Sequence, residues 1–283
     1  MGRFEGQVAL ITGGARGMGR SHALALAREG ADIALVDMCH DLGTVGYPLA
    51  TAADLEETAA LVRKEGRRAW TFEADVRDFE ALQAAVDAVA DPDTEDGPGR
   101  LDIVIANAGV SAGDSIQVAG AEQWRDVIEI NLTGTFHTFR AAAPHLIRAR
   151  RGRMVGISSM MGRAPTGAMG AYTASKWGVI GLVKSSAQDL AHFGITVNAV
   201  APGNVDTPMV RNDFLTRKVR PDLENPTFDD AKAFIGMLHV QPDPLLQPEE
   251  ISAAILFLCS EDARHITGTV IDVSAGATAR ASA

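Results

Sequence analysis

The sequence has few cysteines and no cluster of metal-binding side chains. Its two cysteines, Cys39 and Cys259, lie far apart and form no redox or metal motif. The histidines have no metal-ligand spacing either, so we expect no metal site. Such sparse use of cysteine is typical of a reducing compartment and predicts a cytoplasmic protein.

Basic residues are also in the minority. The chain has 26 Lys and Arg against 36 Asp and Glu, a formal net charge of −10. This balance argues against nucleic acid and anionic membranes as partners. No apolar run approaches the length of about 20 residues that spans a bilayer. The first six residues carry charges of both signs, so we expect no signal peptide.

The chain contains no internal repeat, low-complexity tract or inter-domain linker. At 283 residues it could hold one large domain or two small ones, and its uninterrupted pattern favours a single domain over residues 1–283. Short apolar runs rich in Val and Ile alternate with amphipathic segments. This alternation predicts an α/β fold with a parallel sheet covered by helices on both faces. We expect strands at 8–12, 33–37, 69–74, 103–106, 154–158, 196–201 and 270–273. We expect helices at 17–29, 53–64, 79–90, 121–148, 168–191 and 248–260.

Two segments interrupt this alternation. Residues 38–52 form an insertion after the second expected strand, and residues 204–247 form a longer, proline-rich segment. Long loops on such a scaffold are usually functional. We interpret 38–52 as a cover on the cofactor side, with a surface embellishment as the alternative, and 204–247 as a cover on the substrate side.

The first expected strand runs into a glycine-rich turn and then a helix. Gly13, Gly17 and Gly19 follow the spacing Gly-x-x-x-Gly-x-Gly, which departs from the commoner Gly-x-Gly-x-x-Gly. The glycines allow a tight turn and close backbone approach, and the helix amino end offers N–H groups to a pyrophosphate. The turn therefore predicts a dinucleotide site, to which Arg16 and Met18 also belong.

Asp37 ends the second expected strand, about twenty residues beyond the turn. A carboxylate at this point accepts hydrogen bonds from both ribose hydroxyls and repels a 2′-phosphate, which favours NAD over NADP. Arg16 is the one residue of the turn that favours a phosphate instead. The neighbouring Met38 is expected to contact the same cofactor.

Further cofactor contacts are expected where later strands end. Asp75 closes the third strand, where its carboxylate would meet the adenine amine, and Val76 follows it. Small residues after the fourth strand would let the cofactor pass over the sheet edge. These residues are Asn107, Ala108 and Gly109.

Tyr172 and Lys176 lie four residues apart in an expected helix, on the same face. A positive charge beside a phenol favours the phenolate and brings it into the range of acid–base chemistry. On its own this pair is a weak signal, because many helices carry the same spacing by chance on a solvated surface. Ser159 precedes Tyr172 by thirteen residues, and Asn131 lies inside a long helix where a buried amide needs a partner. Polar and small residues also follow the sixth strand, and we expect them to contact the cofactor: Pro202, Gly203, Val205 and Thr207.

Taken together and in this order, these motifs resemble the short-chain dehydrogenase/reductase family over essentially the whole chain. The resemblance implies a Rossmann-type sheet of seven strands in the order 3-2-1-4-5-6-7 and hydride transfer between NAD and an alcohol or carbonyl. It implies that Tyr172 is the general acid/base and that Lys176 lowers its pKa and holds the nicotinamide ribose. Ser159 would hydrogen-bond the reacting oxygen, Asn131 would hold a proton-relaying water, and Thr207 would touch the carboxamide.

The insertion 38–52, the segment 220–226 and the stretch 263–268 are similar to the carveol-dehydrogenase-like, mycofactocin-coupled subgroup of that family. This similarity implies a small apolar alcohol, such as a terpenoid, as substrate. It also implies a tightly held NAD and a peptide-derived redox carrier, mycofactocin, as electron acceptor. Family members pair through their long helices, which implies a homotetramer.

We expect the substrate at Ser159, Tyr172, Met161 and Met209, since flexible apolar side chains suit a hydrophobic alcohol. Two alternatives stay open. One is a 3-oxoacyl-thioester ketoreductase with a freely exchanging cofactor, against which Asp37 argues. The other is a catalytically silent NAD-binding sensor, which would predict loss of the catalytic positions.

Overall fold

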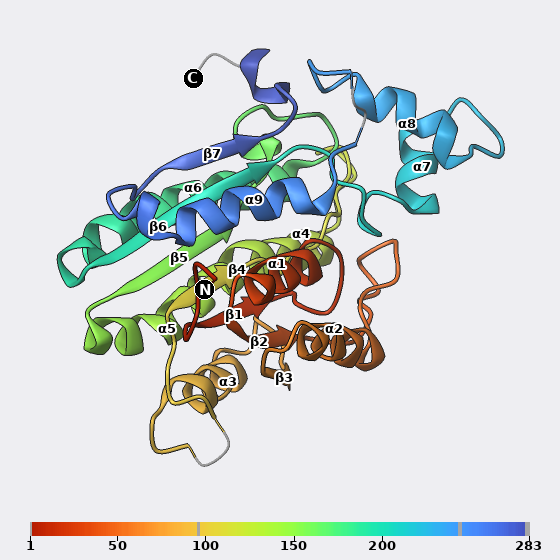
Figure 1. Ribbon diagram of the computed structural model, residues 1–283. Coiled ribbons are helices and arrows are strands. Elements are labelled where there is room, and N and C mark those ends of the chain that lie inside the picture. Colours follow the sequence, from red (N-terminus) through yellow and green to blue (C-terminus); the bar gives the residue numbers. More distant parts are fainter. Residues whose placement is uncertain (1, 95–96, 243–244, 281–283) are drawn as a thin grey trace.

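The computed structural model describes residues 2–94, 97–242 and 245–280. Its strands form one parallel seven-stranded sheet in the order β3-β2-β1-β4-β5-β6-β7 (Figure 1). The predicted fold class and strand order are thus confirmed. The strands are β1 (Val8–Thr12), β2 (Asp32–Asp37), β3 (Ala69–Glu73), β4 (Ile103–Ala106), β5 (Gly152–Ile157), β6 (Ile195–Pro202) and β7 (Val270–Val273). The α-helices are α1 (Gly17–Arg28), α2 (Ala52–Lys64), α3 (Phe79–Ala90), α4 (Ala121–Ile128), α5 (Gly134–Ala149), α6 (Gly170–Leu190), α7 (Asp213–Val219), α8 (Phe228–Gly236) and α9 (Pro248–Cys259).

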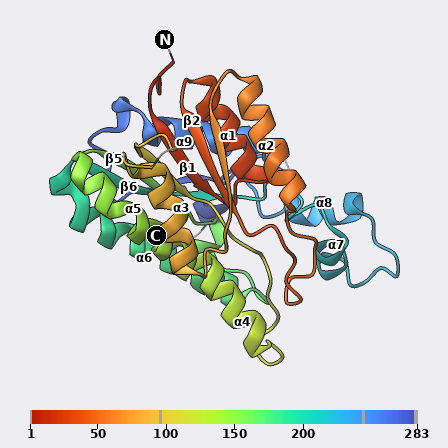
Figure 2. The same cartoon turned by 90° about the horizontal axis from the view of Figure 1, so that it is seen from below.

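Helices cover both faces of the sheet. Figure 2 shows α1, α2 and α9 on one side and α3, α5 and α6 on the other. Successive residues of a strand point to opposite faces. In β2, for example, Ile33 and Leu35 join the core under α1, α2 and α9, whereas Ala34 and Val36 join the core under α3, α5 and α6. The continuous apolar runs are therefore explained by burial on both faces.

The expected helix over 121–148 is present but is not α-helical throughout. A π-helical turn, Glu129–Thr133, separates α4 from α5 and contains Asn131. A π turn accommodates one extra residue within a helix and is common at functional sites. Here it lets the fully buried Asn131 side chain meet the backbone of Val110.

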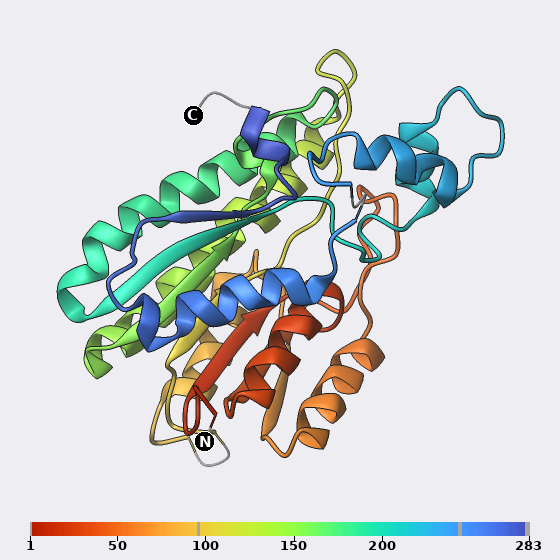
Figure 3. The ribbon, with the colours of Figure 1, turned by 45° about the horizontal axis from the view of Figure 1, so that its top comes forward.

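The two unusual segments lie side by side beyond the carboxyl ends of the strands (Figure 3). The segment 38–52 contains no regular element before α2 begins. The segment 204–247 is not simply a loop, because it includes the short helices α7 and α8. Thr227 caps α8 through a capping box with Asp230, which explains why a helix begins within this proline-rich stretch. Asp243 and Pro244 of this segment lie outside the described residues.

None of the helices in the described part of the chain combines the length and apolar character needed to cross a membrane. Within the same residues, no three His, Cys, Asp or Glu side chains gather in a group that could hold a metal ion.

Candidate active site

Two adjoining hollows lie at the carboxyl ends of the strands, where open α/β sheets bind ligands. The first, which we call the cofactor hollow, has a volume of about 840 Å³ including its open part. The second, the substrate hollow, has about 1490 Å³ on the same measure. Five residues line both and mark the junction between them: Met18, Asn107, Gly109, Thr207 and Met209.

The glycine-rich turn forms one wall of the cofactor hollow. Gly13 and Gly17 have positive φ values of 65° and 55°, a region that favours glycine. A Cβ on Gly13 would lie 2.8 Å from the Ala108 Cα, and one on Gly19 would lie 1.9 Å from the Gly13 carbonyl oxygen. The amino end of α1 has no side-chain cap and no acidic residue in its first turn. Its N–H groups and positive dipole end therefore fit a pyrophosphate.

Asp37 lies at the end of β2 and lines the same hollow. Its carboxylate accepts hydrogen bonds from the backbone N–H of Ala15 at 3.1 Å and of Cys39 at 3.5 Å. Burial raises the pKa of Asp37, although these backbone donors and the nearby Arg16 act in the opposite direction. The carboxylate is fixed in place by the backbone and keeps acceptor capacity for a further donor, such as a ribose hydroxyl.

Arg16 forms a hydrogen bond to segment 38–52. Its guanidinium donates to the carbonyl oxygen of Pro48, so it joins the glycine turn to segment 38–52. It still lines the cofactor hollow, as predicted.

Asp75 does not lie where we expected it. Its neighbours Ala74 and Val76 line the cofactor hollow, but Asp75 does not. Its Oδ2 accepts from the Arg77 Nη2 at 2.7 Å and the Arg77 Nε at 2.9 Å, and its Oδ1 accepts from the Arg77 backbone N–H at 2.9 Å. Arg77 also pairs with Asp126 on α4. A charge-assisted pair with the residue two positions on thus holds the carboxylate that we had assigned to the adenine amine.

Asn107 stabilises the glycine turn. Its side-chain amide donates to the carbonyl oxygens of Thr12 at 3.1 Å and Gly13 at 3.0 Å. Ala108 and Gly109 follow it along the hollow, and the Cα of Ala108 is the atom that a side chain at position 13 would strike.

Ser159, Tyr172 and Lys176 come together on the substrate hollow. Ser159 follows β5, whereas Tyr172 and Lys176 stand on the first two turns of α6. The phenol of Tyr172 is hydrogen-bonded to the Ser159 side chain. The Lys176 ammonium lies 5.6 Å from the centre of the Tyr172 ring and donates to the carbonyl oxygen of Ile157 at 2.8 Å.

Tyr172 and Lys176 are both buried, and burial shifts their pKa values in opposite directions. Removal from water raises the pKa of Tyr172, and the hydrogen bond from Ser159 offsets this only in part. Lys176 is itself 4% exposed, and burial lowers its pKa from 10.5 to about 8. Its ammonium donates to a backbone carbonyl oxygen and lies beside the Tyr172 ring.

Asn131 lines neither hollow but lies close to Lys176. Its amide accepts from the Val110 N–H at 2.8 Å and donates to the Val110 carbonyl at 3.0 Å. It also donates to the Ser175 hydroxyl at 3.1 Å. A Cβ on Gly109 would lie 3.2 Å from the Asn131 Oδ1 and 3.4 Å from the Lys176 Nζ, which brings both side chains against the same glycine.

The substrate hollow is mostly apolar. Met161 and Met209 line it as predicted, together with Pro202, Gly203, Val205 and Thr207. Apolar residues of α7 and α8 that we had not assigned individually complete the lining: Leu215, Val219, Phe234 and Ile235. Lys218 is the one lysine besides Lys176 in this lining, and the sequence offered no signal for it because the fold of 204–247 had to be known first.

Tyr47 of the insertion is a second residue that sequence reasoning missed. Its ring is 6% exposed and lines the cofactor hollow, and its hydroxyl accepts a hydrogen bond from the Ser111 N–H at 3.0 Å. The donor is a backbone group, which no side-chain pattern reveals.

Comparison with known proteins agrees with this geometry. The model of the family described as short chain dehydrogenase matches residues 7–218. (−)-trans-Carveol dehydrogenase of Rhodococcus erythropolis is 46% identical over 280 residues, covering 98% of this chain and 99% of that protein. Trans-4-hydroxycyclohexanecarboxylate dehydrogenase of Sinomonas cyclohexanicum is 36% identical, covering 98% and 95%. The crystal structure of carveol dehydrogenase from Mycobacterium avium in complex with NAD superposes with a TM-score of 0.95 at 46% identity, covering 99% and 100%.

Proposed function

The chain belongs to the short-chain dehydrogenase/reductase family, and we propose that it oxidises small cyclic secondary alcohols with NAD as hydride acceptor. One observation carries this proposal. Ser159, Tyr172 and Lys176 line a mostly apolar hollow that adjoins a second hollow formed by the glycine-rich turn and Asp37. Relatives named for carveol, a hydroxycyclohexane carboxylate and cyclopentanol all act on ring alcohols, which supports the substrate class.

The proposed reaction uses the residues on α6 and after β5. When bound, NAD supplies the acceptor for the hydride that leaves the carbinol carbon. Tyr172 would lose its own proton and take the hydroxyl proton of the alcohol, and Ser159 would donate a hydrogen bond to the oxygen that becomes the carbonyl. Proton transfer by a positioned group contributes about 10²–10⁴-fold to the rate. Lys176, next to both Gly109 and Asn131, is placed to deliver or accept the proton that Tyr172 exchanges.

The residues of the cofactor hollow fit NAD. Asp37 would hold the adenosine ribose, and the uncapped amino end of α1 would hold the pyrophosphate. The fixed carboxylate disfavours a 2′-phosphate, and Arg16, the competing cation, is already paired with Pro48. Pro202, Gly203, Val205 and Thr207 would border the nicotinamide, with Thr207 near Gly17.

We further propose that segment 38–52 covers the cofactor and retains it during turnover. Val45, Tyr47 and Ala50 of this segment are buried, and Arg16 and Ser111 bond to it from the rest of the fold. A cofactor retained in this way must be reoxidised in place. A separate redox carrier, mycofactocin in the subgroup that this chain resembles, would accept the electrons.

The proposal extends to assembly and location. Large apolar side chains stay exposed on α4, α5 and α6: Trp124 at 42%, Phe136 at 42% and Trp177 at 49%. Such residues favour pairing of the long helices in a homotetramer. The scarcity of cysteine supports a cytoplasmic location.

A panel of cyclic and acyclic alcohols, assayed both with added NAD and with a dye as electron acceptor, tests this function. We expect turnover of cyclic secondary alcohols and none of acyl thioesters. Preferential reduction of a 3-oxoacyl thioester with NADPH would instead favour the ketoreductase alternative.

A further inference from the structure

The two covering segments are fastened to one short loop, residues 107–114, which follows β4. Tyr47, from segment 38–52, accepts a hydrogen bond from the Ser111 N–H at 3.0 Å. Lys218, from α7 in segment 204–247, donates to the carbonyl oxygen of Gly113 and lies 3.4 Å from the Asp114 carboxylate. The two loop residues that bind the covering segments, Ser111 and Gly113, are therefore separated by one residue in the sequence.

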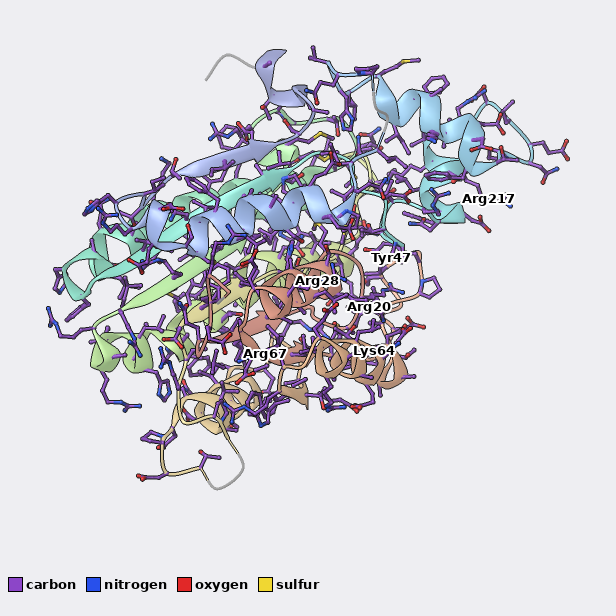
Figure 4. All side chains as sticks on the ribbon, in the orientation of Figure 1. Arg20, Arg28, Tyr47, Lys64, Arg67 and Arg217 are labelled. Atoms are coloured by element: carbon purple, nitrogen blue, oxygen red, sulfur yellow. The ribbon has the colours of Figure 1, made fainter. Side chains whose placement is uncertain are left out.

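The two segments also contact each other. A Cβ on Gly46 would lie 2.3 Å from the ring of Phe214 on α7, so the backbone of the insertion packs directly on that ring. The Lys218 Nζ lies 5.6 Å from the centre of the same ring. Figure 4 shows Tyr47 between the carboxyl end of the sheet and α7. Neither segment can move away from the crevice without disturbing this contact.

The loop 107–114 also contacts Asn131 and borders the substrate hollow. Asn131 binds both the N–H and the carbonyl of Val110, directly before Ser111. Ser111 itself lines the substrate hollow. The loop that anchors both covers therefore also borders the substrate hollow.

We propose that Tyr47 and Lys218 are positioning residues that make the cofactor cover and the substrate cover close as one unit. The inference rests on the proposed function, because it takes NAD as the ligand under the first cover and a cyclic alcohol under the second. Tyr47 lines only the cofactor hollow and Lys218 only the substrate hollow. Because the two covers share loop 107–114 and the contact between Gly46 and Phe214, each residue should affect the ligand in the other hollow.

The first experiment replaces Lys218 by methionine, which keeps the length of the side chain and removes its charge. Release of radiolabelled NAD is followed after a chase with unlabelled NAD. Loss of one hydrogen bond predicts release about three- to tenfold faster than in the wild-type protein. Lys184→Met is the matched control. Lys184 also donates to a backbone carbonyl, that of Gly268 at 3.3 Å, but lines neither hollow, so its variant should release NAD at the wild-type rate.

The reciprocal experiment uses Tyr47→Phe, which keeps the buried ring and removes the hydroxyl. With cyclohexanol as probe we expect KM to rise about three- to tenfold while kcat changes less. Unfolding curves establish that both variants are folded. NAD release from Lys218→Met at the rate of Lys184→Met would overturn the joint closure. A wild-type protein that binds no NAD would instead overturn the proposed function, and the inference with it.

Discussion

Replacing Lys176 by methionine tests how burial of the Lys176 ammonium changes its pKa and, through the pKa, the free energy of unfolding. Lys176 is 4% exposed, and its Nζ donates to the Ile157 carbonyl oxygen at 2.8 Å. Burial lowers the pKa of this group from 10.5 to about 8, because the charged form loses its hydration. Methionine retains most of the side-chain volume and carries no charge.

The sign of the effect follows from proton binding. Below pH 8 the lysine is charged in both the native and the unfolded state, and the cost of burying the charge is fully present. Between the native pKa of about 8 and the unfolded value of 10.5, the unfolded state binds more protons, so the free energy of unfolding rises with pH. At about 1.4 kcal/mol per pH unit, the wild-type protein gains about 2 kcal/mol between pH 7 and pH 9.5. The variant lacks this gain.

Urea unfolding of both nucleotide-free proteins at pH 7, 8 and 9.5 measures the difference. Tyr172 and the other titrating groups are common to both proteins, so the difference isolates Lys176. We expect the stability of the wild type relative to Lys176→Met to increase by about 2 kcal/mol across the series. A difference that stays constant with pH would refute the lowered pKa and the account of the buried ammonium.

Three further predictions concern the site. Tyr172→Phe should retain NAD but lose about 10²–10⁴-fold in kcat for alcohol oxidation, and near wild-type turnover would remove Tyr172 as the acid/base. Asp37→Ala should weaken the preference for NAD over NADP by about tenfold or more, measured as the ratio of kcat/KM values, whereas an unchanged ratio would contradict the ribose contact. Protein purified without added nucleotide should release NAD on denaturation and should turn over a cyclic alcohol with a dye acceptor. Steady release of NADH with NAD alone would count against a retained cofactor.

Local sequence patterns were enough to predict the glycine-rich turn, the carboxylate at the end of β2 and the Tyr172/Lys176 pair. The positive φ values of Gly13 and Gly17, and the end of β2 at Asp37, follow from residues close together in the sequence. The same holds for Tyr172 and Lys176, because helical spacing alone places them on one face of α6. The strand order also agreed with the family resemblance.

Features that depend on distant contacts were not predictable in this way. A regular α-helical period was expected across residues 121–148, so the π turn around Asn131 was not predicted. The ion pair between Asp75 and Arg77 competes with an adenine contact that spacing alone suggested. The pairing of Tyr47 with the Ser111 N–H depends on how two loops fold, and the pKa of Lys176 depends on its burial.

The central claim is that this chain oxidises a cyclic secondary alcohol by hydride transfer to NAD with Tyr172 as the base. A single-turnover experiment tests it most directly: NAD-loaded wild type and NAD-loaded Tyr172→Phe are each mixed with cyclohexanol, and NADH absorbance is followed in time. The account predicts a rapid rise for the wild type and, at the same NAD content, a rise slower by about 10²-fold or more for the variant. Equal rates in the two proteins, or no NADH from the wild type with any cyclic alcohol of the panel, would contradict it.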